Sequence, residues 1–155
     1  MEIRMAKPED IPGLTDLLLQ VGEVHHKIRP DLFRSGAQKY DEKALTEILK
    51  DPNRPIFAAV EDGTLLGYCF CILEITRDNP VLMDQKSLYI DDLCVDENAR
   101  GKHVGARLYD FAVDYARKIG CDSLTLNVWC GNDSAMKFYE SRGLKQRNIH
   151  MEARL

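Results

Sequence analysis

The chain has 155 residues, which is the length of one ordinary domain, so the sequence predicts a single domain over residues 1–155 with one functional site. Its 45% hydrophobic and 30% charged residues are typical of a soluble globular protein, and no apolar run is long enough to span a membrane. A net charge of -4 argues against a nucleic-acid partner, which normally needs a basic field. The N-terminus lacks the apolar core of a signal peptide, so the cytoplasm is the expected location.

The cysteines form no CxxC pair and lie mostly within apolar, strand-like segments. Buried, reduced thiols are therefore expected in preference to disulfides or a zinc site, and no metal site is predicted. This prediction covers Cys69, Cys71, Cys94, Cys121 and Cys130.

The first third of the chain predicts a short strand and two helices. Residues 2–6 alternate weakly, and a helix follows from Pro8. Its apolar face holds Ile11, Leu14, Leu17, Leu18 and Val21. Residues 21–36 show no clear pattern, and a second helix is expected from about Asp41, its candidate N-cap.

The middle of the chain predicts a β-hairpin and then a strand–helix–strand unit. Apolar runs at 56–60 and 64–75 flank an Asp-Gly turn. Residues 87–95 predict the next strand, and Leu124 to Val128 predict another by strict alternation. The helical stripe between them consists of Val104, Leu108, Phe111, Ala112 and Tyr115. A crossover helix of this kind predicts a parallel strand pair.

A last helix should begin near Asn132 and stop at Gly143, which suits the left-handed position after a helix. The tail, residues 145–155, is expected to form one or two closing strands. No repeat or linker interrupts this order of elements. The sequence therefore predicts an α+β fold with a mixed sheet.

The stretch ENARGKHVGARLYDF, residues 97–111, places two glycines and several bases where a strand gives way to a helix. A helix N-terminus has free N–H groups and a positive dipole end, and phosphate is its natural ligand. Alternatively, Gly101 and Gly105 only permit a tight turn and close packing, while Arg100 and Lys102 are solvated. The loop alone favours neither explanation, and it is neither a P-loop nor GxGxxG.

This loop resembles the Q/R-x-x-G-x-G/A acetyl-CoA loop of the Gcn5-related N-acetyltransferases (GNAT), with Arg100 first and Gly105 as the last glycine. His103 stands where the first motif glycine usually does. We expect it to be tolerated, because a residue inside the first turn of a helix keeps a negative φ. NDSAMKFYESRGL, residues 132–144, is similar to the family's N-x-x-A-x-x-F-Y-x-x-x-G-F segment. The resemblance implies a GNAT-like acyl-CoA N-acyltransferase fold, whose mostly antiparallel sheet has one splayed parallel pair.

The resemblance also implies a reaction: transfer of acetyl from acetyl-CoA, a co-substrate, to a primary amine by direct attack in a ternary complex. The backbone at Leu93, Cys94 and Val95 would pair with the pantetheine arm, and its N–H groups would polarise the thioester carbonyl. The pyrophosphate would lie on the loop, with Arg100 adding charge. This cradle would comprise Gly101, Lys102, His103, Val104, Gly105 and Ala106. Asn132 would contact the cofactor, although a plain N-cap role explains it equally well.

Tyr139 matches the family tyrosine near the CoA sulfur, and by that resemblance it is the candidate general acid. Asp91 and Asp92 are candidates for the base that deprotonates the amine. Since consecutive strand residues point to opposite faces, at most one of them should face the acceptor. Water-mediated proton transfer competes with both. His25 and His26 lie in the segment that helps wall the acceptor site in this family.

Two other functions compete with catalysis. The first is a CoA-binding regulatory module without turnover, which His103 favours and Tyr139 disfavours. The second is a nucleotide-binding module, which lacks the expected Ser/Thr and ribose-binding acid. For the enzyme, the expected partner is an amine acceptor, such as a polyamine-like molecule, an antibiotic or a protein N-terminus. A membrane partner is not expected, and homodimers are common in the family.

Overall fold

The computed structural model describes residues 1–155. Its strands are β1 (Glu2–Met5), β2 (Ile56–Glu61), β3 (Thr64–Thr76), β4 (Gln85–Val95) and β5 (Ser123–Leu126). Its α-helices are α1 (Ile11–Ile28), α2 (Glu42–Ile48), α3 (Val104–Lys118) and α4 (Asp133–Ser141). Short 3-10 turns at Pro8–Asp10 and Glu97–Ala99 precede α1 and α3.

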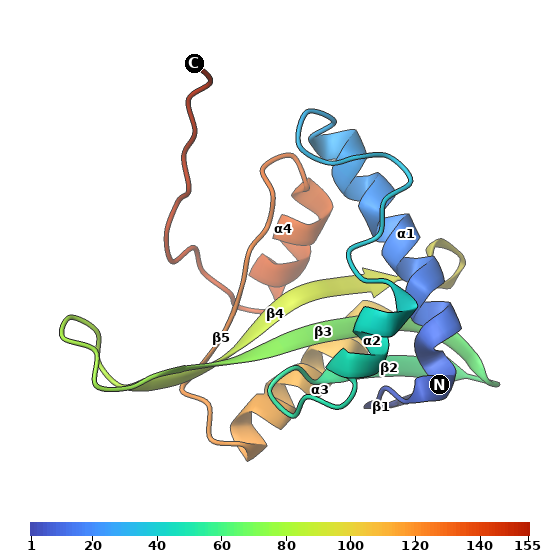
Figure 1. The fold of residues 1–155 in the computed structure, drawn as a ribbon, viewed down its shortest axis with the longest axis horizontal. Coiled ribbons are helices and arrows are strands. Elements are labelled where there is room, and N and C mark those ends of the chain that lie inside the picture. The colour runs from blue at the N-terminus through green and yellow to red at the C-terminus, as the bar shows by residue number, and fades with distance from the viewer.

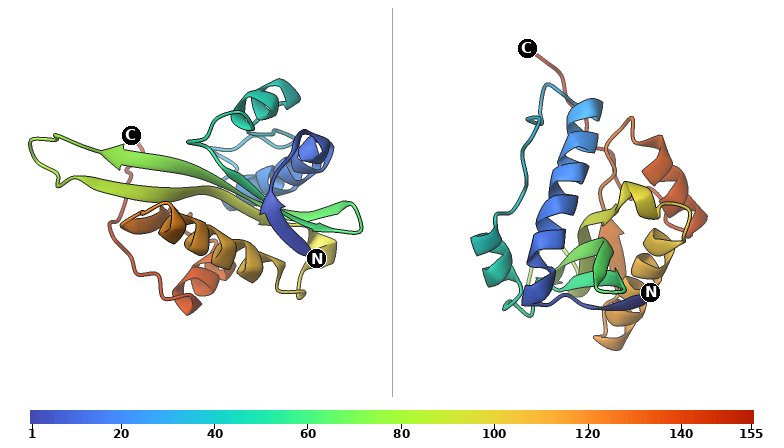
Figure 2. Two further views of the ribbon diagram at one scale, coloured as in Figure 1. Left: turned by 90° about the horizontal axis from the view of Figure 1, so that it is seen from below. Right: turned by 90° about the vertical axis from the view of Figure 1, so that its right-hand side faces the viewer.

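The strands form one sheet in the order β1-β2-β3-β4-β5. The first three pairings are antiparallel, and β4 pairs with β5 in parallel through the crossover helix α3. Figure 2 (left) shows α1 and α2 on one face of the sheet and α3 and α4 on the other. This confirms the predicted α+β fold with a mixed sheet.

Each face of the sheet has its own apolar core. The α1 and α2 side buries Leu14, Leu17, Leu18, Leu45, Ile48, Ile56, Tyr68, Phe70 and Cys94. The α3 side buries Phe57, Ala59, Cys69, Cys71, Leu88, Ile90, Ala99, Val104, Leu108, Tyr109, Ala112 and Ala116. Three cysteines are thus buried as predicted, whereas Cys121 is partly buried and Cys130 is exposed.

The predicted turns and caps follow from local chemistry. Asp62 and Gly63 have φ values of 50° and 78°, the conformation of a two-residue hairpin turn. The Asp41 side chain accepts from the Ala44 N–H (2.7 Å) and caps α2. At the end of α4, Gly143 is left-handed (φ 86°) and its N–H donates to the Glu140 carbonyl at 2.9 Å, as a helix stop requires.

α1 continues to Ile28, through part of the segment that had no predicted form. Its last two turns contact the following loop and not only the sheet. For example, His26 Nδ1 lies 2.7 Å from the Phe33 carbonyl oxygen. A helix that packs on two surfaces carries no single apolar stripe, which explains why periodicity did not identify these turns.

β4 contains one extra residue. Ile90 pairs with Cys71 and Asp92 pairs with Phe70, so Asp91 has no partner on β3. Such a bulge reverses which face the alternate side chains take. Before the bulge, Ile90 faces α3, and after it Cys94 faces α1.

The prediction of closing strands in the tail is wrong. Residues 145–155 form no strand and take part in no backbone–backbone hydrogen bond. Polar tail side chains instead bind the end of α1, where Arg29 pairs with Glu152 (2.5 Å) and Asp31 with Arg154. Figure 1 shows the tail as an extended segment that stands away from the sheet. None of the helices combines the length and the apolar character needed to cross a bilayer.

Candidate active site

β4 and β5 separate halfway along their length. Their pairing begins at Ser87 with Ser123 and ends at Ile90 with Leu126, although β4 continues to Val95. The Asp96 N–H donates to the Leu66 carbonyl at 2.9 Å. By alternation, the N–H groups of Leu93 and Val95 therefore point away from β3, toward the edge where β5 has left the sheet. This edge offers backbone donors that no strand uses.

A second set of free donors lies at the N-terminus of α3. No N–H group from Arg100 to Ala106 donates to another backbone group; the first that does is Arg107, to the His103 carbonyl at 3.1 Å. Free N–H groups at a helix N-terminus, next to the positive end of its dipole, form a ready anion site. Arg100 is exposed beside them, and Lys102 has only a distant acid, Glu61 at 3.9 Å.

The two glycines of this loop have different roles. Gly101 is left-handed (φ 80°) with open space around its Cα, as a turn requires. A Cβ on Gly105 would lie 3.4 Å from Val95 Cγ2 and 3.9 Å from Phe138 Cζ. These are ordinary van der Waals distances, so α3 packs on β4 and α4 at Gly105, and this packing brings the free helix N–H groups next to the free edge of β4.

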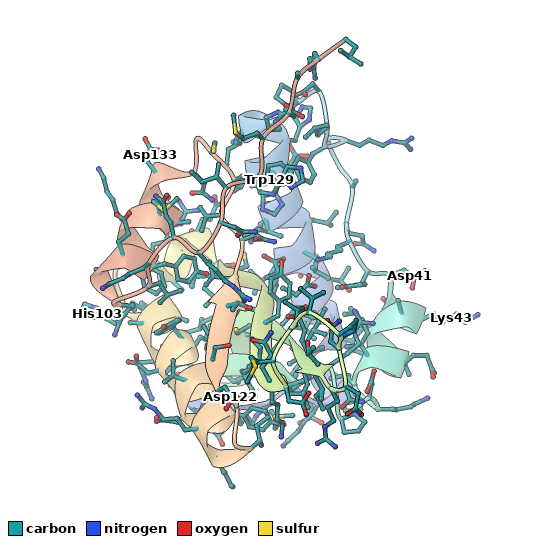
Figure 3. The ribbon with its side chains drawn as sticks, turned by 90° about the vertical axis from the view of Figure 1, so that its left-hand side faces the viewer. Asp41, Lys43, His103, Asp122, Trp129 and Asp133 are labelled. Carbon is teal, nitrogen blue, oxygen red and sulfur yellow. The ribbon has the colours of Figure 1, made fainter.

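The expectation that His103 keeps a negative φ is wrong. His103 is left-handed, with a φ of 58°, and its side chain is exposed. The reason is that α3 begins at Val104, so His103 is the N-cap and lies in the chain reversal before the first turn. Figure 3 shows His103 where α3 and α4 meet.

α4 brings Tyr139 and Asn132 to the same side of the sheet. Tyr139 packs edge-on against Phe138, with centroids 5.1 Å apart, and burial raises the pKa of its hydroxyl well above the ordinary value. The hydroxyls of Tyr40 and Tyr68 are bound by aspartates, whereas that of Tyr139 has no partner in the chain. Asn132 Oδ1 accepts from the Ala135 N–H at 3.3 Å, so its capping role accounts for this oxygen.

The prediction that Asp91 and Asp92 point to opposite faces is wrong, and the bulge is the reason. Asp92 accepts a hydrogen bond from Tyr68 Oη (2.8 Å), and Asp91 accepts one from Tyr40 Oη (3.0 Å). Both tyrosines pack against Phe70, with ring centroids 4.8 and 5.5 Å away. Both carboxylates therefore lie on the side of α1 and α2.

The two carboxylates differ in their electrostatic surroundings. Asp91 is ion-paired with Lys39 Nζ at 2.7 Å, and Lys39 is 52 residues away in the chain, so sequence reasoning missed it. Burial raises the pKa of Asp92, although the Tyr68 hydrogen bond and the charges of His25 and Lys39 oppose this. A carboxyl whose pKa is raised toward neutrality suits a proton acceptor.

Aromatic side chains connect the end of α1 to the loop after β5. The rings of His25 and Phe33 have centroids 5.1 Å apart, and Phe33 meets Trp129 edge-on at 5.2 Å. Figure 3 shows Trp129 between this loop and α1. Nearby, Asn127 Nδ2 donates to Tyr89 Oη at 3.1 Å across the separating strands. Sequence reasoning missed Phe33 and Trp129, although a single tryptophan directly after a predicted strand was an available signal.

Comparisons with known proteins agree with this geometry. Residues 22–144 match the model of the "Acetyltransferase (GNAT) family". The uncharacterized N-acetyltransferase YhfO of Bacillus subtilis is 32% identical over 94% of this chain and 91% of its own. Glucosamine 6-phosphate N-acetyltransferase of Arabidopsis thaliana is 27% identical over 54% of this chain and 63% of its own.

Solved structures give the same fold. A mutant of the BH1408 protein from Bacillus halodurans has a TM-score of 0.95 and 30% identity, covering 100% of this chain and 99% of its own. The aminoglycoside N-acetyltransferase AAC(6')-Iy, solved in complex with CoA, has a TM-score of 0.71 and 17% identity, covering 99% and 100%. The family match over most of the chain and the relative with 32% identity along nearly its whole length lead to one conclusion. This chain belongs to the GNAT family of acetyltransferases.

Proposed function

We propose that this protein transfers an acetyl group from acetyl-CoA to a primary amine of a small molecule or a protein, by direct attack in a ternary complex. The observation that carries the proposal is the adjacency of two sets of free backbone donors. One set runs from Arg100 to Ala106, and the other is at Leu93 and Val95. Because α3 packs on β4 through Gly105, one extended ligand can use both sets.

The loop residues and the free edge of β4 fit acetyl-CoA, which supplies an activated thioester when bound. The N–H groups of Gly101 to Ala106 hold the pyrophosphate, and Arg100 adds a charge-assisted contact. The N–H groups of Leu93 and Val95 orient the pantetheine arm. They also donate to the carbonyl oxygen as negative charge develops there.

Tyr139 and Asp92 are proposed to move the protons. A tyrosine with a raised pKa stays protonated at neutral pH, so Tyr139 donates to the departing thiolate. Asp92 takes the proton that the amine must lose before it attacks. Asp91 is the weaker candidate, because its carboxylate is already neutralised by Lys39.

The competing function is a CoA-binding module without turnover. The observation in its favour is the exposed, left-handed His103 in the middle of the loop. Against it stands the hydroxyl of Tyr139, which has no partner in the chain; its side chain packs on the same core cluster as Leu93 and Val95. Binding alone does not separate the two functions, so the test has a binding arm and a turnover arm.

The binding arm is calorimetric titration with acetyl-CoA, with ADP as a control for adenine and phosphate alone. Arg100→Glu should weaken acetyl-CoA binding by about tenfold or more, because it puts an anion beside the pyrophosphate. Lys118→Glu makes the same charge change at the other end of α3, roughly 20 Å away, and should leave binding unchanged. A folded wild-type protein that does not bind acetyl-CoA would contradict the proposal.

The turnover arm measures release of the CoA thiol with a panel of primary amines. Tyr139→Phe should lower kcat by roughly 10–100-fold while the dissociation constant for acetyl-CoA changes little, because only the proton donor is removed. Tyr109→Phe is the matched control, since Tyr109 packs on Tyr139 from α3, with ring centroids 6.2 Å apart, and has no proposed role in the reaction. Equal turnover by wild type and Tyr139→Phe, where chemistry limits the rate, excludes the acid role.

A further inference from the structure

α1 runs beside the end of β4 and makes polar contacts with it in two successive turns. The Cys94 thiol donates to the Leu17 carbonyl oxygen at 3.6 Å. One turn later, Gln20 Nε2 donates to Asp96 Oδ2 at 3.2 Å, and Gln20 Oε1 accepts from the Glu97 N–H at 3.4 Å. Both ends of a single side-chain amide are therefore used to bind the residues that directly follow β4.

Asp96 is the joint between the two sets of free backbone donors. The N–H groups of Leu93 and Val95 come before it in the chain, and those of residues 100–106 come after it. The Asp96 N–H is bound by β3, and its Oδ1 caps the short turn that follows by accepting from the Asn98 N–H at 2.8 Å. Hydrogen bonds from Asn98 and then from the amide on α1 lower the pKa of the Asp96 carboxyl, so an ionised acceptor lies at the joint.

The angle at this joint matters to a ligand that uses both donor sets, and not to a ligand that uses one of them. α1 is a rigid support for the joint, because Leu14, Leu17 and Leu18 bury the helix in the core on its side of the sheet. A side chain that fixes a joint from a rigid element removes part of the ordering that binding would otherwise require. Gln20 is placed to do this for the segment from β4 to α3.

We propose that Gln20 is a positioning residue for acetyl-CoA, which sets the angle between the free edge of β4 and the loop before α3. The inference rests on the proposed function, because it needs a ligand that spans both donor sets. Gln20 touches no part of the cofactor in this role and acts through Asp96 and the Glu97 N–H. The same helix carries His25, whose ring meets Phe33 on the side where we expect the acceptor. α1 therefore connects the two sides of the site.

The first test compares a ligand that spans the joint with one that does not. Gln20→Ala should raise the dissociation constant for acetyl-CoA, measured by calorimetry, by roughly fivefold, because the hydrogen bonds that fix the joint are lost. ADP has the pyrophosphate but no pantetheine arm, so its affinity, measured by NMR titration, should be the same for wild type and variant. Gln146→Ala is the control: it removes the same amide from the exposed tail, where the side chain has no hydrogen bond, and should change neither affinity.

The second test exchanges donor and acceptor between α1 and the joint. Gln20→Glu sets two carboxylates against each other and should raise the dissociation constant for acetyl-CoA by roughly tenfold. Adding Asp96→Asn reverses the contact: the new carboxylate at position 20 accepts from the new amide at position 96 and from the Glu97 N–H. The amide oxygen at position 96 still caps the turn at Asn98, and the net charge of the double variant is that of wild type. The double variant should therefore bind acetyl-CoA within about twofold of wild type.

Each result supports or overturns the inference. Gln20 lies in neither core, so the variants should fold. Wild-type affinity for acetyl-CoA in Gln20→Ala overturns the inference, and so does an equal weakening of ADP and acetyl-CoA, which would indicate general damage to the loop. A double variant that binds acetyl-CoA no better than Gln20→Glu alone overturns it as well. In all of these cases wild type still binds acetyl-CoA, whereas a wild type that does not bind it overturns the proposed function together with this inference.

Discussion

His103 is a residue in a backbone conformation that favours glycine. A side chain in the left-handed region brings Cβ close to the following carbonyl, which costs roughly 1 kcal/mol. The surrounding turn holds His103 there because α3 has to begin at Val104, whose side chain is buried in the core. The position is therefore strained, and its strain is independent of whether the imidazole contacts a ligand.

We predict that His103→Gly raises the free energy of unfolding by about 0.5–1 kcal/mol, because glycine adopts this φ without strain. Urea unfolding measures the change. Lys102→Gly is the control: Lys102 does not have a positive φ, so glycine there adds only chain entropy to the unfolded state and should destabilise. If both variants lose stability, the left-handed strain at His103 is not a significant cost.

Asp92 and Asp91 are adjacent in the chain, but substituting them should lower catalytic efficiency by very different amounts. Asp92→Asn should lower kcat/KM by roughly 10²–10⁴-fold, as loss of a general base does, whereas Asp91→Asn should cost less than about tenfold. Asparagine keeps an acceptor for Tyr68, so the fold is preserved. Comparable losses in both variants would place the proton-transfer role elsewhere, for instance in a water chain.

The raised pKa of Asp92 also predicts a change in stability. A folded-state pKa above the unfolded value means that the folded protein binds the proton more tightly, so ionised Asp92 destabilises the fold at neutral pH. Asp92→Asn should therefore raise the melting temperature at pH 7. This gain should disappear as the pH falls below about 4, where the carboxyl is protonated in both states. A lower melting temperature at pH 7 would contradict the assigned direction.

At the scale of elements, Asp10 joins β1 to the start of α1. Its carboxylate is buried and accepts from Arg4 through two hydrogen bonds, of 2.7 and 3.0 Å, and from the Lys7 N–H at 2.7 Å. Burial alone would raise the pKa of Asp10, but Arg4 and Lys7 overcome this and lower it. A carboxyl group whose pKa is lowered by folding stabilises the folded state at pH values above its unfolded-state pKa. This contribution is lost as the pH falls through the folded-state pKa.

We predict that Asp10→Asn costs about 2–3 kcal/mol of folding free energy at pH 7, because it leaves the Arg4 guanidinium without its counter-ion. Chemical denaturation at several pH values measures this. The difference in folding free energy between wild type and variant should become smaller below about pH 4, because wild-type Asp10 itself becomes protonated. A difference in folding free energy that does not depend on pH would mean that packing, and not charge, accounts for the lower stability of the variant.

The elements that sequence could predict are those whose signals are local. Periodicity identified the core strands, and single residues such as Asp41 and Gly143 marked helix ends. The bulge at Asp91 was not predictable, because it is defined by the count of residues against the opposite strand. The tail was predicted to form closing strands, but a short sequence does not show whether a partner strand lies beside it. The second half of α1 was not predicted for a third reason: it packs on two surfaces, so its sequence has no single apolar stripe.

For the whole molecule, the two halves of the candidate site differ in how far sequence can predict them. The proposed cofactor side comes from two continuous segments, 93–106 and 132–139, and each carries its own motif. The side where we expect the acceptor is assembled from α1, the loop after it and the loop after β5, which the contacts of Phe33 with His25 and Trp129 hold together. No motif spans such a set, so the family could be predicted from sequence and the acceptor could not.

The extra residue in β4 divides that strand into two halves, in which the alternation of side chains between the two faces of the sheet is reversed. Before Asp91, even-numbered residues such as Ile90 face α3, whereas after it even-numbered residues such as Cys94 face α1. Substitution at Asp91 leaves the faces of the other side chains unchanged, because the number of residues in β4 stays the same. Deletion of Asp91 would remove the bulge and leave a regular strand, in which Asp92 still faces α1 and Leu93 still faces α3. The extra residue therefore determines which of the two adjacent aspartates pairs with Phe70: in the bulged strand it is Asp92, and in a regular strand of the same sequence it would be Asp91.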